Sequence, residues 1–138
     1  MADFKQAFLQ TMKFEGGWNL VKGDRGGETY KGIARNFFQN WAGWKIIDTH
    51  KPLKNNAIIN DLMLDNLVLQ FYKTEFWDIV GGDSIEDQPT AKTLFDFGVN
   101  AGHGQSIKNL QITLKIPITG KISNELINAV NNPENYLV

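Results

Sequence analysis

Residues 61–77 read DLMLDNLVLQFYKTEFW, a long stretch in which apolar side chains recur at helical spacing. Asp61 suits an N-cap, because its carboxylate can accept hydrogen bonds from the first free backbone amides of a helix. The apolar positions that follow form a broad face, which continues to about Trp77. A helix with so wide an apolar face needs partners on several sides. We therefore expect a central core helix from Asp61 to about Trp77.

Helical signals continue on both sides of this segment. Asp3 and Gln6 form a capping-box pattern, Pro89 suits a first helical turn, and Gly102 suits a helix end. The further helices that we expect lie at about residues 4–15, 34–41, 89–101, 105–114 and 123–130. The β structure is at most a small hairpin between residues 18 and 31. The predicted fold class is therefore mainly α.

Length and composition limit the classes of protein and site. The 138 residues are 42% hydrophobic, which is enough to bury about 70% of the unfolded surface in one core, so we expect a single domain over residues 1–138. The chain carries 14 basic and 15 acidic residues without a long run of either sign, a balance that favours no nucleic-acid partner. It has no cysteine and two distant histidines. We therefore expect no disulfide, metal site or cofactor.

Glu15 stands at the end of the first expected helix, just before two glycines. The apolar side chains of that helix recur on one face from Phe4 to Met12, and Glu15 falls on the same face. A carboxylate there loses hydration and lies near the negative end of the helix dipole, and both effects raise its pKa. A Glu that is protonated at neutral pH suits the general acid of a glycosidase. The alternative is a structural carboxylate paired with Arg25 or Lys22.

A glycine-rich loop follows, with six glycines in residues 16–32. Such density indicates positive φ angles or a close approach of another chain segment or a ligand. An ionised Asp24 could stabilise an oxocarbenium-like transition state or position water, and the Thr29 hydroxyl could bind that water. The alternatives are an Asx turn at Asp24 and a hairpin strand at Thr29. Trp18 and Tyr30 flank the loop as platforms for sugar rings, or else as core side chains.

The run from Phe14 to Ile33 reads Glu-Gly-Gly-aromatic and then Asp-x-Gly-Gly-x-Thr-x-x-Gly-Ile. This pattern resembles the N-terminal signature of glycoside hydrolase family 108, which comprises bacterial and phage N-acetylmuramidases of lysozyme-like character. Residues 76–78 (Phe-Trp-Asp) and residues 95–102 (FDFGVNAG), followed by Leu110 and Gln111, are similar to later segments of the family. The resemblance covers most of the chain.

The resemblance implies a lysozyme-like, mainly helical domain that hydrolyses the β-1,4 bond between N-acetylmuramic acid and N-acetylglucosamine, with Glu15 as the catalytic acid. It divides the chain into a catalytic part, residues 1–87, and a helical part, residues 88–138, that resembles a truncated peptidoglycan-binding region. In this second part Asn100 could hydrogen-bond an N-acetyl group or a hydroxyl of the substrate, or else cap a helix.

A looser similarity links the chain to phage-type lysozymes, which carry Glu, Asp and Thr in the order of Glu15, Asp24 and Thr29. The Glu-to-Asp spacing matches, and the Asp-to-Thr spacing is one residue shorter here. Two other functions stay open at this point. One is a peptidoglycan-binding or secretion-associated protein without turnover, and the other is a lytic transglycosylase that uses Glu15 alone.

The expected partner is the glycan strand of peptidoglycan, and we expect a monomer. The first residues lack the basic and apolar regions of a signal peptide, and the chain has no apolar stretch of about 18 residues that would span a membrane. We therefore expect synthesis in the cytoplasm and action at the cell wall or periplasm after holin-type or specialised export.

Overall fold

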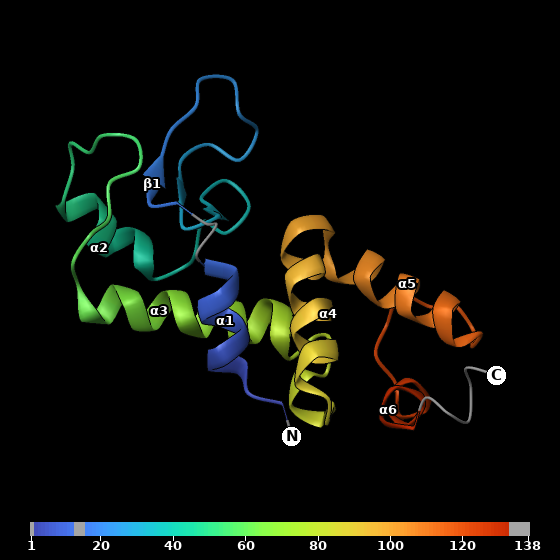
Figure 1. Ribbon diagram of the computed structural model, residues 1–138. Coiled ribbons are helices and arrows are strands. Elements are labelled where there is room, and N and C mark those ends of the chain that lie inside the picture. The colour runs from blue at the N-terminus through green and yellow to red at the C-terminus, as the bar shows by residue number, and fades with distance from the viewer. Residues whose placement is uncertain (1, 13–15, 133–138) are drawn as a thin grey trace. The chain divides into compact units, whose positions relative to one another are not determined.

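The computed structural model describes residues 2–12 and 16–132, and Figure 1 shows that its elements are mainly helices. The backbone divides into two compact units. The loop unit comprises Leu9–Gln70, and the helical unit comprises Met1–Phe8 together with Phe71–Val138. Two helices, α1 (Phe4–Met12) and α3 (Leu62–Tyr72), contribute residues to both units.

The loop unit contains a small antiparallel sheet with the strand order β1-β2-β3. Its strands are β1 (Trp18–Asn19), β2 (Thr29–Tyr30) and β3 (Ile33–Ala34). The first two strands confirm the predicted hairpin, and the third extends the sheet beyond it. Lys31 and Gly32 connect β2 to β3 with φ angles of 47° and 84°. Two consecutive residues with positive φ are typical of a tight hairpin turn, which explains a glycine at this point of the loop.

The helix predicted at residues 34–41 is wrong, because this segment folds as a strand end and turns. Ala34 pairs with Thr29 in the sheet. The next two backbone N–H groups, of Arg35 and Asn36, donate to carbonyls of residues 28 and 26 at 2.9 Å each. These bonds satisfy both backbone donors and hold the segment against the glycine-rich loop. Helix α2 begins later and runs over Gly43–Thr49.

The predicted core helix is confirmed, with a change in its last turn. The Leu64 N–H donates to Asp61 Oδ1 at 2.9 Å, so Asp61 is the cap that the sequence predicted. Helix α3 ends at Tyr72, and a π-helical turn, η1 (Lys73–Trp77), continues it to the predicted end. Leu64 and Val68 of α3 are buried.

The helical unit consists mainly of α4 (Gln88–Ala101), α5 (His103–Leu114) and α6 (Asn124–Asn131), with a short 3-10 turn, η2 (Gly82–Ser84). Asp87 and Ser123 cap α4 and α6, since their side chains accept hydrogen bonds from the N–H groups of residues 90 and 126. Gly102 ends α4 as predicted, at a φ of 97°. Helix α5 follows at once and begins two residues before the predicted start.

Aromatic rings form the centre of the helical unit. The ring of Phe4 lies 5.5 Å from that of Trp77 and 5.7 Å from that of Phe95, and the rings of Trp77 and Phe95 are 5.8 Å apart. The Trp77 indole N–H, which would be costly to bury alone, donates to Asp83 at 2.8 Å. The cluster therefore ties the first residues of the chain to η1 and α4.

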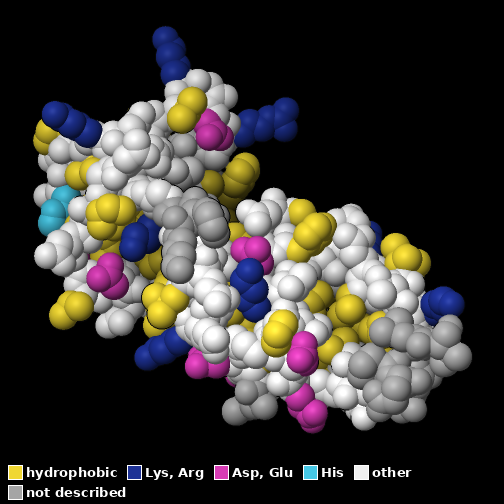
Figure 2. All heavy atoms as spheres, in the orientation of Figure 1, with side chains coloured by type: hydrophobic (Ala, Val, Ile, Leu, Met, Phe, Trp, Pro, Cys, Tyr) yellow, Lys and Arg dark blue, Asp and Glu magenta, His cyan; other side chains and the backbone are white. Residues whose placement is uncertain are grey.

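The prediction of a mainly α fold with a small sheet, as in a lysozyme-like domain, is confirmed. The single domain over residues 1–138 stays a prediction. Within the described ranges, no helix is both long and apolar enough to span a bilayer. On the face that Figure 2 shows, Lys and Arg side chains stand apart from one another rather than forming one basic area.

Candidate functional site

Glu15 lies outside the described residues, so its raised pKa stays a prediction. The structure does explain why the residue two positions after Glu15 is a glycine. A Cβ on Gly17 would lie 2.0 Å from the carbonyl oxygen of Ala57. The same oxygen accepts a hydrogen bond from the Trp18 N–H at 2.8 Å. Two backbone segments thus meet directly after Glu15, at a separation that only glycine allows.

Trp18 and Tyr30, the predicted sugar platforms, pair across β1 and β2 and are buried, at 8% and 0% exposure. The Tyr30 hydroxyl accepts a hydrogen bond from the Ile59 N–H at 3.1 Å. Burial raises the pKa of this hydroxyl above its usual value. This burial agrees with the alternative, core packing of the loop, and the part of the two rings in sugar binding stays a prediction.

Asp24 and Thr29 lie on the same loop, as predicted. Asp24 is exposed, and its Oδ1 accepts a hydrogen bond from the Gly26 N–H at 2.9 Å, which forms the Asx turn considered as the alternative. Thr29 pairs with Asn19 on one side and Ala34 on the other, as the middle strand of the sheet. This geometry fixes their backbones, and their part in catalysis stays a prediction.

Asn100 lies near the end of α4 in the helical unit. Its side-chain amide donates to the carbonyl oxygen of Asp96, one turn earlier, at 3.0 Å. Gly102, and not Asn100, occupies the C-cap. Asn100 is exposed, and its part in substrate binding stays a prediction.

The sequence did not reveal a cluster of charged side chains that joins the glycine-rich loop to later residues of the same unit. This Glu28 cluster comprises Glu28, Arg35, Asp48 and Lys51. The side chain of Glu28 is 10% exposed, and its carboxylate lies 2.5 Å from Arg35 and 2.8 Å from Lys51. The two cations also pair with Asp48, at 2.7 and 2.9 Å. The Trp18 indole N–H donates to the same Glu28 carboxylate at 3.0 Å, which joins the cluster to β1.

These contacts decide the charge of Glu28. Burial alone raises the pKa of its carboxyl, but hydrogen bonds from Lys51, Arg35 and Trp18 outweigh burial and hold the pKa below its usual value. Hydrogen bonds from Arg35 and Lys51 likewise lower the pKa of Asp48. Glu28 is therefore ionised at neutral pH and its charge is balanced. It suits a structural anchor and does not suit a proton donor.

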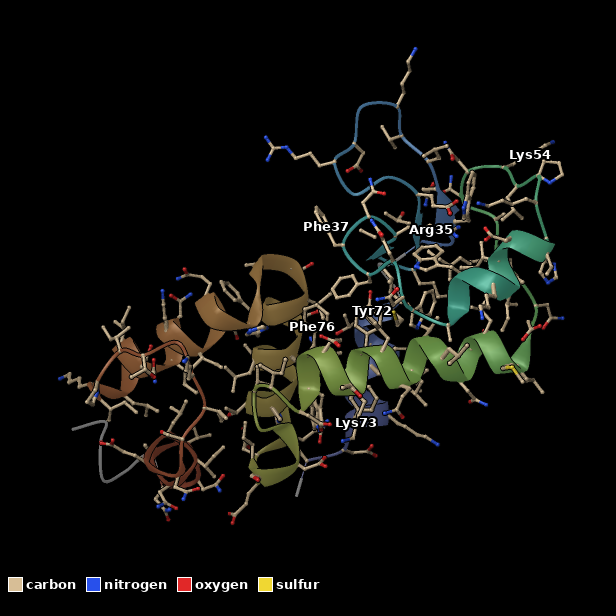
Figure 3. All side chains as sticks on the ribbon, turned by 180° about the vertical axis from the view of Figure 1, so that it is seen from behind. Arg35, Phe37, Lys54, Tyr72, Lys73 and Phe76 are labelled. Carbon is tan, nitrogen blue, oxygen red and sulfur yellow. The ribbon has the colours of Figure 1, made fainter. Side chains whose placement is uncertain are left out.

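Glu28 stands between Gly27 and Thr29, at an unspecified position of the loop's sequence pattern, so the pattern itself gave no signal for it. Its partners lie 7 and 23 residues away, and only the folding of the loop brings them together. Figure 3 shows Arg35 on the turn that follows the sheet. Its guanidinium carbon lies 5.3 Å from the centre of the Trp44 ring, a cation–π contact that helps to fix it.

Two further features concern ligands. Among the residues that the structure describes, no three His, Asp or Glu side chains are grouped so that they could hold a metal ion. The helical unit contains a pocket of about 360 Å³ between α4 and α5. Its lining carries no charged side chain and includes Phe97, Thr93 and Asn109. Such a mixture of an aromatic ring with hydroxyl and amide groups suits an uncharged, partly apolar ligand.

Comparisons with known proteins agree with this fold. Residues 8–102 match the family model described as glycosyl hydrolase 108. A solved structure, that of SagA from Brucella abortus, is similar with a TM-score of 0.63 over 94% of this chain and 68% of that chain. The two sequences are 22% identical, so this likeness concerns the fold. No curated protein matches the chain.

Proposed function

The chain belongs to glycosyl hydrolase family 108, and we propose that it hydrolyses the β-1,4 bond between N-acetylmuramic acid and N-acetylglucosamine in peptidoglycan. The observation that carries the proposal is the glycine-rich loop after Glu15, which lies inside the matched region and is held by close backbone contacts and by the Glu28 cluster. A loop fixed in this way can present catalytic groups without rearrangement during the reaction.

In the proposed reaction, Glu15 donates its proton to the glycosidic oxygen as the bond to the anomeric carbon breaks. Positive charge then develops on the sugar that keeps this carbon. Asp24 stabilises that charge or activates the water that attacks the carbon, and Thr29 orients the water. The water oxygen becomes the new hydroxyl, and its proton returns to the solvent or to a carboxylate.

The electrostatics of Glu28 agree with this assignment of Glu15. Two cations pair with Glu28 and hold its pKa below the usual value, so it does not suit a proton donor. Asp24 is exposed, so water can reach it. We propose Glu15 as the proton donor because of its place at the end of the first expected helix.

The helical part, residues 88–138, would contribute to wall binding, and the uncharged pocket between α4 and α5 is its candidate ligand site. Asn100 would add a hydrogen bond to an N-acetyl group or hydroxyl of the glycan. The place of action would be the cell wall or periplasm, reached by holin-type or specialised export.

The test is digestion of purified peptidoglycan by the wild type and by Glu15→Gln, with mass analysis of the released sugars. Glu15→Gln keeps the size of the side chain and removes the acid, so we expect a rate loss of about a hundredfold or more. Glu86→Gln is a matched control at an exposed position in the helical unit, and we expect it to keep the wild-type rate.

The products separate this proposal from the other functions. Reducing N-acetylmuramic acid ends support hydrolysis. Anhydro ends would instead indicate a lytic transglycosylase, because that reaction closes a ring in place of adding water. Binding without release of any sugar would contradict both enzymatic functions.

A further inference from the structure

Among the described residues of the loop unit, an exposed aromatic ring lies beside the glycine-rich loop. Phe37 is 66% exposed, whereas Trp18 and Tyr30 of the same loop are buried. A single exposed apolar side chain is common on protein surfaces and by itself indicates little. The position of this ring relative to the loop gives it significance.

The turn that carries Phe37 is fixed against the glycine-rich loop. The Asn36 backbone N–H donates to the carbonyl of Gly26 at 2.9 Å, and its side-chain amide donates to the carbonyl of Arg25 at 3.0 Å. A Cβ on Gly26 would lie 2.9 Å from the Cβ of Ala34, so glycine permits this close packing. The backbone at Phe37 is therefore held while its ring stays in solvent.

Phe37 and Asp24 border the same point of the loop. The position of a Cβ on Gly26 lies 3.6 Å from Phe37 Cε2 and 3.5 Å from Asp24 Oδ1. An exposed ring and an exposed carboxylate thus both lie close to a residue without a side chain. Figure 3 shows Phe37 on the turn next to Arg35.

This pair of groups matches the two kinds of surface that a sugar presents. One face of a hexosamine ring is made of C–H groups that pack on an aromatic ring, and its rim carries hydroxyls that donate to carboxylates. Phe37 offers more exposed ring surface for this contact than the buried Trp18 and Tyr30. We propose that Phe37 stacks on a sugar of the bound glycan strand, next to Asp24. The inference rests on the proposed function.

The test compares Phe37→Ala, Phe37→Trp and the wild type on soluble peptidoglycan glycan fragments, with KM and kcat measured separately. Loss of one stacking contact worth about 0.5–1.5 kcal/mol corresponds to a rise in KM of roughly two- to tenfold with kcat little changed. Phe37→Trp restores the ring and should restore KM. Leu62→Ala is the control, since Leu62 is 81% exposed on α3 of the same unit. Matching thermal unfolding curves would show that the variants fold.

A second measurement separates this inference from the proposed function. Glu15→Gln, with and without Phe37→Ala, is mixed with insoluble peptidoglycan, and the bound fraction is measured by sedimentation. Weaker binding of the double variant supports the inference. If Phe37→Ala changes neither KM nor binding and the wild type still hydrolyses peptidoglycan, the inference about Phe37 is overturned and the proposed function is kept. If the wild type releases no sugar, the proposed function fails, and the sedimentation result alone decides whether Phe37 binds glycan.

Discussion

Replacing Glu28 by Gln should destabilise the protein, because the substitution removes the charge that Arg35 and Lys51 share. The side chain of Glu28 is 10% exposed, whereas those of Arg35 and Lys51 are 33% and 35% exposed. Gln keeps an oxygen that can still accept the hydrogen bond from the Trp18 indole. The loss is therefore mainly electrostatic.

The exposure of the partners sets the size of this effect. Breaking a fully buried ion pair costs about 3–5 kcal/mol, and an exposed pair contributes about 0.2–1 kcal/mol. Here the Glu28 side chain is largely buried, whereas the Arg35 and Lys51 side chains reach solvent. Both cations also keep Asp48 as a second partner. We expect Glu28→Gln to lower the free energy of unfolding by about 1–2 kcal/mol, an intermediate value between these limits.

Urea unfolding followed by tryptophan fluorescence measures this difference. Glu86→Gln is again the control, since Glu86 is exposed and the described residues show no ion pair for it. We expect this control to lie within about 0.5 kcal/mol of the wild type. Equal stabilities of Glu28→Gln and Glu86→Gln would refute the claim that the Glu28 cluster anchors the loop.

Two further predictions concern the same loop. Gly17→Ala should lower the free energy of unfolding by about 1–3 kcal/mol more than Gly16→Ala. A Cβ on Gly17 would lie 2.0 Å from the Ala57 carbonyl oxygen, whereas the nearest atom to a Cβ on Gly16 is a side-chain atom at 3.4 Å. Equal urea midpoints of the two variants would contradict this prediction. The pKa of Glu28 lies below its usual 4.5, so its stabilising effect is complete above about pH 4.5 and is lost as pH falls through the lower, folded-state pKa. Unfolding measured at a series of acidic pH values should therefore show a shallower loss for Glu28→Gln than for the wild type, and parallel curves would argue against the lowered pKa.

The helices could be predicted where local signals decide the structure. Asp61 and Ser123 begin α3 and α6 because each side chain caps the amides that follow it. The small hairpin between residues 18 and 31 was also predicted, and β1 and β2 form it. The turns at residues 34–41 could not be predicted, because the apolar side chains of this segment have helical spacing. Backbone hydrogen bonds to residues of the preceding loop hold the segment in turns.

The candidate site shows the same limit. The position of Glu15, Asp24 and Thr29 in one glycine-rich segment was visible in the sequence, since it depends on neighbours along the chain. The sequence could not show that Trp18 and Tyr30 are buried and Phe37 is exposed, because all three are aromatic residues near the same glycines. Strand pairing places Trp18 opposite Tyr30, whereas Phe37 lies in the turn after the sheet. The ion pairs of Glu28 likewise depend on contacts with residues far away in sequence.

The most direct test of the central claim is digestion of peptidoglycan in water enriched in the heavy oxygen isotope, followed by mass analysis of the released glycans. The proposed hydrolysis predicts that one heavy oxygen enters each new reducing end, that this end is N-acetylmuramic acid, and that Glu15→Gln forms almost none. Anhydro ends without heavy oxygen, labelled N-acetylglucosamine ends, or equal label from Glu15→Gln would contradict it.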